Sequence, residues 1–216
     1  MTITVFIADD HAVLRDGLRA LLEATGDIEV IGEAENGRDA VRFVEEHQPD
    51  VALMDISMPE LNGIEATKQI TKNVARTRVV MLSMHEDPEY VFRAFQAGAS
   101  GYLLKESAGR DVVAAVREAA SGKTYVSKPI ADMLISTTQA KKPQDESSPL
   151  ECLTLREREI LQMVVEGNSN RDISKALSIS VRSVETYRSR IMQKLGVYNV
   201  PDLVKLAIRH GITSVN

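Results

Sequence analysis

The sequence predicts two domains: an α/β domain with a doubly wound, five-stranded parallel sheet, followed by a small all-α domain. Short apolar segments alternate with segments of helical spacing in the first half of the chain, a pattern typical of a parallel sheet covered by helices on both faces. Residues 136–149 are polar, contain two prolines and show no apolar period, which indicates a linker. After the linker, every segment has helical spacing. The 216 residues are enough for two hydrophobic cores.

The five strands are predicted from apolar or β-rich segments of suitable length. These segments are residues 3–8, 28–34, 51–54, 79–82 and 101–104. Apolar side chains recur at helical spacing in residues 14–22, 40–44 and 64–70. Asn36 is suited to cap the second of these helices, and Asp87 before Pro88 predicts a further helix that ends at Gly98.

The second domain is predicted to contain four helices. Thr154 with Glu157, and Ser169 with Asp172, have the spacing of a capping box, in which each side chain bonds the other residue's backbone N–H. Two further helices follow a turn at residues 178–180, and they span residues 181–196 and 200–210.

Composition excludes some classes of protein. The chain has no apolar run of about eighteen residues and does not start with a basic, apolar leader, so we expect a soluble, cytoplasmic protein without membrane contact. A single cysteine, Cys152, cannot form an internal disulfide, and we expect it to be a small buried or boundary side chain.

The net charge of −5 is distributed unevenly along the chain. Residues 150–216 carry ten lysines and arginines against seven aspartates and glutamates, which gives +3 and leaves −8 for the rest. Most of this positive charge lies between Arg171 and Lys194. Such a basic segment is typical of a nucleic-acid contact, although a solvated helical face would carry similar charges.

Ionisable residues follow the predicted strands. Asp9 and Asp10 follow the first strand, Asp55 the third, Ser83 the fourth and Lys105 the fifth. Because the carboxyl ends of parallel strands lie at one edge of a sheet, these side chains should meet there. Three carboxylates repel one another unless a cation compensates, and an incomplete set of oxygen ligands suits Mg²⁺. An aspartate beside Mg²⁺ can act as the nucleophile toward a phosphoryl group.

Residues 1–122 resemble the receiver domain of response regulators, which has a flavodoxin-like fold. The matching residues are Asp9, Asp10, Asp55, Met58, Pro59, Gly63, Ser83, Tyr102 and Lys105. The resemblance implies that Asp55 accepts a phosphoryl group from a sensor histidine kinase. It also implies that Asp10, Asp55 and the backbone carbonyl of Ser57 hold Mg²⁺, with Asp9 acting through water.

The same resemblance implies how the phosphorylated state is recognised. Ser83 would hydrogen-bond the phosphate, Lys105 would neutralise its charge, and Tyr102 would swing inward. Two positions depart from the common receiver pattern: Glu106 stands where many receivers have proline, so no cis peptide is expected there, and Met84 stands where a small residue is usual. The Met84 side chain could crowd the path of an attacking water, which affects the lifetime of the phosphorylated state and not its existence.

Residues 153–212 resemble the LuxR-type helix-turn-helix of the NarL/FixJ family. The resemblance is carried by LTLREREIL, VEGNSNRDISKAL and SISVRSVETYRSRIMQKLGV, with Tyr187 at a position where histidine is commonest. The domains are therefore expected to be a receiver at 1–122, a linker region at 123–149 and a helix-turn-helix domain at 150–216.

The helix at 181–195 has two opposed faces. The apolar face, which should pack inside the domain, consists of Val184, Tyr187, Ile191 and Leu195. The polar face, suited to reading base edges in the major groove, consists of Arg182, Glu185, Thr186, Ser189 and Gln193. Three basic residues are placed to meet flanking phosphates of double-stranded DNA, namely Arg188, Arg190 and Lys194. A polar face can also be merely solvated; the basic neighbours and the preceding turn favour DNA.

Together the two halves predict a regulator of transcription in which phosphorylation promotes a homodimer that binds two DNA half-sites. A stripe in the last helix could form the dimer contact or could only close the domain core, and it consists of Leu203, Leu206, Ala207 and His210. No enzyme activity is expected beyond the protein's own phosphoryl transfer.

Two rival functions fit these residues less well. One rival is a phosphate-transfer hydrolase of the haloacid dehalogenase type, but these enzymes usually have a second aspartate two residues after the nucleophile, where this chain has Ser57. The other rival is a receiver that only dimerises, independently of phosphate, and the intact acidic pocket argues against it.

Overall fold

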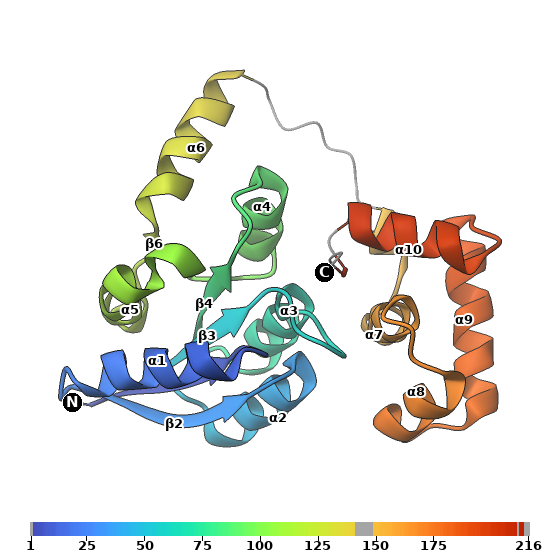
Figure 1. Ribbon diagram of the computed structural model, residues 1–216, viewed down its shortest axis with the longest axis horizontal. Coiled ribbons are helices and arrows are strands. Elements are labelled where there is room, and N and C mark those ends of the chain that lie inside the picture. The colour runs from blue at the N-terminus through green and yellow to red at the C-terminus, as the bar shows by residue number, and fades with distance from the viewer. Residues whose placement is uncertain (1, 141–148, 211, 214–216) are drawn as a thin grey trace. The chain divides into compact units, whose positions relative to one another are not determined.

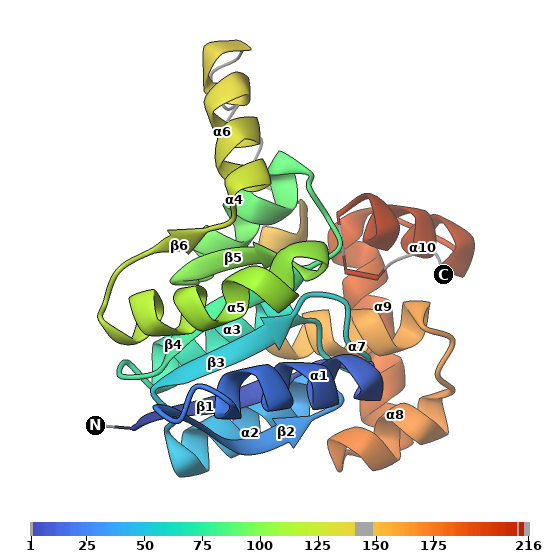
Figure 2. The same cartoon turned by 60° about the vertical axis from the view of Figure 1, so that its left-hand side comes forward.

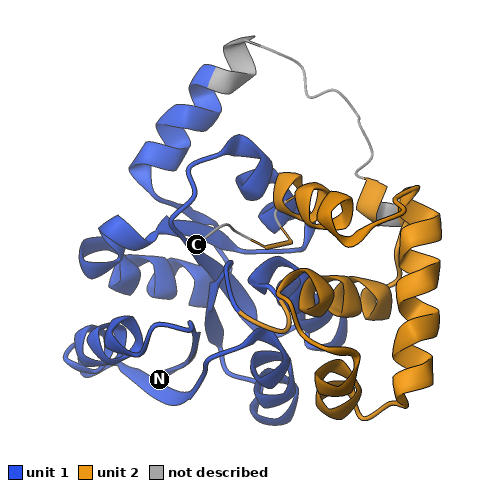
Figure 3. Ribbon diagram, turned by 45° about the vertical axis from the view of Figure 1, so that its right-hand side comes forward, with its two compact units in different colours: residues 1–58, 62–142 blue, residues 59–61, 143–216 orange. Residues whose placement is uncertain are grey.

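The computed structural model describes residues 2–140, 149–210 and 212–213 (Figure 1). The chain divides into two compact units, Met1–Met58 with Asn62–Lys142 and Pro59–Leu61 with Pro143–Asn216 (Figure 3). Each unit has a hydrophobic core of its own.

The first unit is built on one parallel sheet. Its strands are β1 (Ile3–Ala8), β2 (Ile28–Ala34), β3 (Val51–Asp55), β4 (Arg78–Ser83), β5 (Gly101–Leu104) and β6 (Tyr125–Val126). They lie in the order β2-β1-β3-β4-β5-β6, and every neighbouring pair is parallel. The five predicted strands are confirmed. The sixth has only two residues, too few to show a period in the sequence.

Helices cover both faces of this sheet, as predicted for a doubly wound fold. They are α1 (Ala12–Glu23), α2 (Gly37–His47), α3 (Gly63–Asn73), α4 (Pro88–Gln96) and α5 (Lys105–Ala120). A sixth helix, α6 (Lys128–Ala140), follows β6 and extends away from the sheet (Figure 2). One core lies between the sheet and the pair α1 and α5, which Figure 2 shows together in front of the strands. On the other face Phe43 of α2 stacks on Phe6 of β1, and Thr67 of α3 contacts Met81 of β4.

The predicted helix starts are confirmed by their caps. The Asn36 side chain accepts a hydrogen bond from the backbone of Asp39, and Asp87 does the same for Glu89. The latter helix ends just before Gly98, whose φ of +96° suits glycine. These caps fix where each helix begins after a strand, which in turn fixes the loops at the carboxyl end of the sheet.

The region 123–149, expected to be a linker, contains more structure than the sequence indicated. β6 pairs with β5, and α6 then runs to Ala140, into the segment predicted to be irregular. Ile130 of this helix is fully buried, so its first turns are anchored on the first unit, and the helix continues from them into polar residues. The rest of the predicted linker, residues 141–148, lies outside the described residues.

The second unit contains only helices in its described part. They are the 3₁₀ turn η1 (Pro149–Cys152), α7 (Leu155–Val165), α8 (Asn170–Leu177), α9 (Val181–Leu195) and α10 (Val200–Arg209). Both predicted capping boxes are present, and Ser178 takes a left-handed conformation at the predicted turn. Cys152 is exposed rather than buried, because it lies in η1 and outside the helical core.

The stripe on α10 closes the core of its own unit. Leu203 and Ala207 are buried among the core residues, and Leu206 packs against the same cluster. Leu203 and Ala207 therefore have the core-closing role, whereas Leu206 and His210 of the same stripe remain partly exposed.

Candidate functional site

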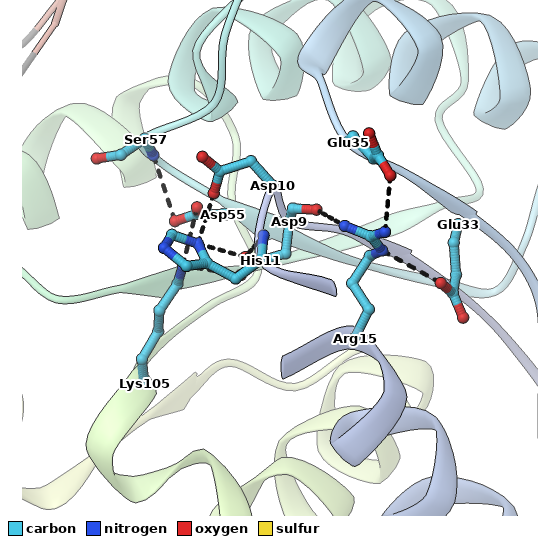
Figure 4. A network of polar contacts seen from close by, with 9 residues as sticks. All are labelled: Asp9, Asp10, His11, Arg15, Glu33, Glu35, Asp55, Ser57 and Lys105. Atoms are coloured by element: carbon cyan, nitrogen blue, oxygen red, sulfur yellow. Dashed lines mark hydrogen bonds and ion pairs between the residues drawn. The ribbon is translucent and has the colours of Figure 1, made fainter. Parts of the chain in front are cut away.

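The charged residues predicted at the strand ends, Asp9, Asp10, Asp55 and Lys105, meet in one cluster, which we call the acidic pocket. Asp9 follows β1, Asp55 ends β3 and Lys105 directly follows β5 (Figure 4). Ligand atoms of Asp9, Asp10, His11 and Asp55 all lie within 4.8 Å of one another. The parallel topology therefore gathers this acidic cluster, as the sequence predicted.

Lys105 bridges the two buried carboxylates. Its Nζ lies 2.8 Å from Asp9 Oδ2 and 2.8 Å from Asp55 Oδ2, and both aspartates are almost completely buried. Burial and the charge of Asp9 raise the pKa of Asp55, although Lys105 opposes this. Burial by itself would lower the pKa of Lys105, but Asp55 and Asp9 outweigh it and the pKa is raised. The pocket thus holds one cation and has a surplus of negative charge.

A glycine shapes the backbone around Asp55. The Gly63 amide donates to the carbonyl of Ile56 at 2.9 Å, which folds the loop back over the end of β3. A Cβ on Gly63 would overlap the backbone carbonyl oxygen of Asp55. Only glycine allows this close approach, which explains its presence at the start of α3.

The other two predicted ligand residues, Asp10 and Ser57, are exposed, whereas Asp9 and Asp55 are buried. The backbone N–H of Ser57 donates to Asp55 Oδ1 at 3.3 Å, so the loop carrying the Ser57 carbonyl is close to the phosphoacceptor candidate. The Asp10 side chain is partly exposed, unlike that of Asp9. This arrangement places Asp55 inside the pocket and Asp10 toward solvent.

Two residues of the site were missed by sequence reasoning. The His11 Nδ1 lies 3.1 Å from Asp9 Oδ1 and 2.6 Å from Asp10 Oδ1. Arg15 is buried, and its Nη1 donates to the backbone carbonyl of Asp9 at 2.7 Å. The sequence did contain a signal for the latter, because Arg15 shares the buried helical stripe of Leu18 and Leu22.

Ser83 ends β4, the strand that pairs with β3, and Tyr102 lies in the next strand, β5. Ser83 is buried, and its Oγ accepts a hydrogen bond from the backbone N–H of His85 at 2.9 Å. Tyr102 is fully buried, its hydroxyl donates to the His85 carbonyl at 2.8 Å, and burial raises its pKa to about 12. The inward position of Tyr102, expected to follow phosphorylation, is already occupied here because the His85 carbonyl supplies an acceptor.

The loop after Ser83 is held by an aromatic contact that the sequence did not predict. The rings of His85 and Tyr90 stack with centroids 4.3 Å apart. The neighbouring Met84 side chain is 64% exposed, so in this structure it points into solvent. No cis peptide occurs among the described residues, Glu106 included, as expected.

The two predicted faces of α9 are present. On the apolar face Val184 and Ile191 are buried, while Tyr187 and Leu195 pack against the same core. The polar face is exposed along its whole length, and its residues are Arg182, Glu185, Thr186, Ser189 and Gln193. An exposed polar face on a helix that follows a tight turn is the arrangement that a helix-turn-helix presents to DNA.

The three basic residues of α9 differ in their surroundings. Arg190 is exposed. Arg188 donates to Asn170 Oδ1 of α8 at 2.7 Å. Lys194 lies 2.6 Å from the buried Glu157 and donates to the Cys152 carbonyl, so it stabilises the unit itself. Two of the three predicted phosphate contacts are thus engaged in contacts within the domain.

No helix in the described part of the chain is long and apolar enough to span a membrane.

Comparison with known proteins assigns both parts of the chain. Residues 5–117 match the response regulator receiver domain family, and residues 151–207 match the luxR family of bacterial regulatory proteins. The response regulator UvrY of Escherichia coli K12 is 38% identical over 210 residues, which cover 97% of this chain and 95% of UvrY. The oxygen regulatory protein NreC of Staphylococcus epidermidis is also 38% identical, over 95% of this chain and 96% of NreC.

A solved structure extends this likeness to a relative bound to DNA. The structure of the response regulator RcsB in complex with DNA is 25% identical, has a TM-score of 0.60, and covers 95% of this chain and 98% of the RcsB chain. These matches favour a response regulator over a small-molecule hydrolase. The chain belongs to the NarL/FixJ family of response regulators, transcription regulators that join a receiver domain to a LuxR-type helix-turn-helix.

Proposed function

We propose that Asp55 is the phosphoacceptor and that its phosphorylation controls DNA binding by the second domain. The observation that carries this proposal is the pairing of a buried Asp55 with Asp9 across the Lys105 ammonium group. Lys105 already balances part of the charge in the pocket, and it can turn to a phosphoryl oxygen when Asp55 becomes an acyl phosphate.

The residues present fit a bound Mg²⁺. Carboxylate oxygens of Asp9, Asp10 and Asp55 lie close together, and such an incomplete all-oxygen set suits an ion that keeps several waters. Asp10, Asp55 and the carbonyl of Ser57 would bind the ion directly, and Asp9 would act through one of its waters. When bound, Mg²⁺ would supply positive charge to the oxygens of the transferred phosphoryl group.

The transfer itself is a displacement at phosphorus. A carboxylate oxygen of Asp55 bonds to phosphorus as the phosphorus–nitrogen bond to the kinase histidine breaks, and the imidazole leaves with the bond's electrons. Ser83 then lies where its hydroxyl can donate to a phosphoryl oxygen, since that hydroxyl already faces the loop after β4. The protein transfers this group only to itself.

The partners follow from the two domains. We infer a sensor histidine kinase as the phosphoryl donor, double-stranded DNA as the target, action in the cytoplasm where that DNA lies, and a homodimer when phosphorylated. Base edges would be read by Arg182, Glu185, Thr186 and Ser189 of the exposed face. Arg188 and Arg190 would contact phosphates, and Lys194 would do so only by leaving Glu157.

The test combines labelling and footprinting. Incubation with acetyl phosphate and Mg²⁺ is expected to add one phosphoryl group, measured by intact mass, and Asp55→Asn is expected to abolish it. Treatment with acetyl phosphate should increase the protection of genomic DNA in footprints of the wild type but not in those of Asp55→Asn. Undiminished labelling of Asp55→Asn would overturn the site assignment, and identical footprints with and without phosphate would favour a phosphate-independent receiver.

A further inference from the structure

A buried arginine lies directly behind the acidic pocket. Arg15 projects from α1, is only 8% exposed, and uses all three guanidinium nitrogens (Figure 4). Its Nη1 donates to the backbone carbonyl of Asp9 at 2.7 Å, Nε lies 3.2 Å from Glu33, and Nη2 lies 2.9 Å from Glu35. One side chain thus connects the start of α1, the end of β2 and the backbone of a pocket residue.

The backbone held by Arg15 carries two of the three carboxylates of the acidic cluster. Asp9 and Asp10 lie in the short connection between β1 and α1, and the N–H of Asp9 bonds the carbonyl of Ala34 at 3.1 Å. The Asp9 side chain in turn accepts from the backbone N–H of His11 at 2.9 Å. Arg15 supplies the restraint on the carbonyl of Asp9, so hydrogen bonds hold the Asp9 backbone both at its N–H and at its carbonyl.

The charge of Arg15 is balanced away from the pocket. A guanidinium group behind a cation site would repel the cation if it were unpaired. Glu33 and Glu35 lie on the β2 side and pair with it, so Asp9 and Asp10 keep their negative charge for the pocket. The arrangement therefore restrains the backbone without consuming a carboxylate of the cluster.

We propose that Arg15 is a positioning residue for divalent-cation binding, acting through the Asp9 carbonyl to hold Asp9 and Asp10 at the spacing that the cation requires. This inference rests on the proposed function of the pocket. Residues that orient metal ligands typically change metal affinity by roughly 10- to 100-fold when they are lost. Loss of Arg15 should therefore weaken cation binding, whereas the reactivity of Asp55 at saturating cation should be nearly unchanged.

The chain contains a matched control on the same helix. Arg19 also projects from α1, pairs with Glu33 at 2.6 Å and donates to the backbone carbonyl of Val30 at 3.0 Å. It makes the same kinds of contact with the same strand, but its carbonyl partner lies in the middle of β2 and not in the pocket. If loss of an α1–β2 contact weakened cation binding only by destabilising the fold, Arg15 and Arg19 variants should both bind the cation more weakly. If Arg15 positions the ligands, only Arg15 variants should do so.

The experiment uses the full chain and two readouts. Binding of Mn²⁺, an oxygen-binding divalent probe, is measured by the electron paramagnetic resonance signal of the free ion, and labelling by acetyl phosphate is followed across a Mg²⁺ titration. For Arg15→Gln we expect Mn²⁺ affinity and the half-saturating Mg²⁺ concentration to worsen by roughly tenfold or more, with the maximal labelling rate within about twofold of wild type. Arg19→Gln should match wild type in both.

Two further variants keep the inference falsifiable if Arg15→Gln does not fold. Arg15→Lys retains the positive charge but lacks the planar guanidinium that reaches all three partners at once, and Glu35→Gln changes an exposed residue that restrains the guanidinium. Both should weaken Mn²⁺ binding by roughly threefold, less than the full loss. Wild-type affinity in these two variants, or equal losses in Arg15→Gln and Arg19→Gln, would overturn the inference. Absence of Mn²⁺ binding and labelling in the wild type would instead overturn the proposed function.

Discussion

At the scale of single residues, the buried and ionised Asp55 lowers the stability of the first domain at neutral pH. Burial and the neighbouring Asp9 raise its pKa, and Lys105 compensates only in part. A carboxyl group whose pKa is higher in the folded than in the unfolded state stabilises the fold below the unfolded pKa, and that stability is lost as pH rises through the folded pKa. At neutral pH the ionised Asp55 is therefore a strained component of the pocket.

Removing that charge is expected to stabilise the protein. Asp55→Asn should raise the free energy of unfolding of the first domain at neutral pH by roughly 1 kcal/mol, the scale found when a strained functional group is replaced. Chemical denaturation at pH 7 and near pH 4 measures this, and the gain should shrink at the lower pH as Asp55 becomes protonated. Asp16→Asn, an exposed change on α1, serves as the control. A loss of stability in Asp55→Asn at pH 7 would contradict this view.

Gly63 permits a second test at the residue scale. A Cβ there meets the Asp55 carbonyl, so Gly63→Ala should lower the free energy of unfolding by about 2 kcal/mol and slow labelling by acetyl phosphate. Gly109→Ala, in α5 with open space around its Cβ, should instead stabilise by about 0.5 to 1 kcal/mol. Equal effects of the two substitutions would show that the close approach at Gly63 does not matter.

At the scale of elements, an ion pair between Glu157 of α7 and Lys194 of α9 contributes to the stability of the second domain. Glu157 is buried, closes the α7 capping box through the Thr154 N–H at 2.8 Å, and lies 2.6 Å from Lys194. Burial tends to raise the pKa of Glu157, but Lys194 and Thr154 outweigh it and the pKa is lowered. Its contribution to stability is therefore present above the unfolded value of 4.5 and lost as pH falls below it.

This contact separates the roles of two basic residues on α9. Lys194→Met should lower the free energy of unfolding of the second domain by roughly 1 to 3 kcal/mol, because it leaves Glu157 buried without its cation, and should reduce the acid sensitivity below pH 4.5. Arg190→Met should leave stability within about 0.5 kcal/mol but weaken binding to all DNA sequences and reduce the salt slope by about one unit. Thermal melts and DNA titrations at several salt concentrations distinguish a structural role from a phosphate contact. A Lys194→Met variant with wild-type stability and a reduced salt slope would show that Lys194 contacts phosphate instead.

Sequence patterns predicted the elements best where local chemistry sets their ends. The capping pairs at Thr154 and Ser169 and the caps at Asn36 and Asp87 are local, so they could be identified from spacing alone. α6 was missed because its anchor, the burial of Ile130, depends on packing against distant elements. The pocket was predictable because strand ends of a parallel sheet meet. The helical stripe could have shown that Arg15 is buried, but not that it bonds the backbone carbonyl of Asp9.

At the scale of the whole molecule, phosphorylation is expected to change both the oligomeric state of the protein and its affinity for DNA. The charge added at Asp55 should draw Ser83 and Lys105 toward the phosphoryl group. Because Tyr102 is already inward, the change should lie in the loop after β4 that His85 and Tyr90 hold, and not in a rotation of Tyr102. Beryllofluoride should convert monomers to dimers in light scattering and tighten DNA binding at least tenfold. Unchanged mass together with unchanged affinity would leave phosphorylation without a role in output.

The parallel sheet of the first domain also determines where its chain can be altered. All the reactive groups lie at one rim, and the opposite rim consists of short connections in which Gly26 and Gly122 have positive φ. A single residue inserted in β3 would move Asp55 by about 3.3 Å and turn it to the other face of the sheet. A residue inserted beside Gly122 would displace none of the groups in the pocket. Insertions and deletions are therefore not tolerated at the rim that carries the reactive groups. At the opposite rim, a reporter, an epitope or a new pair of termini can be introduced.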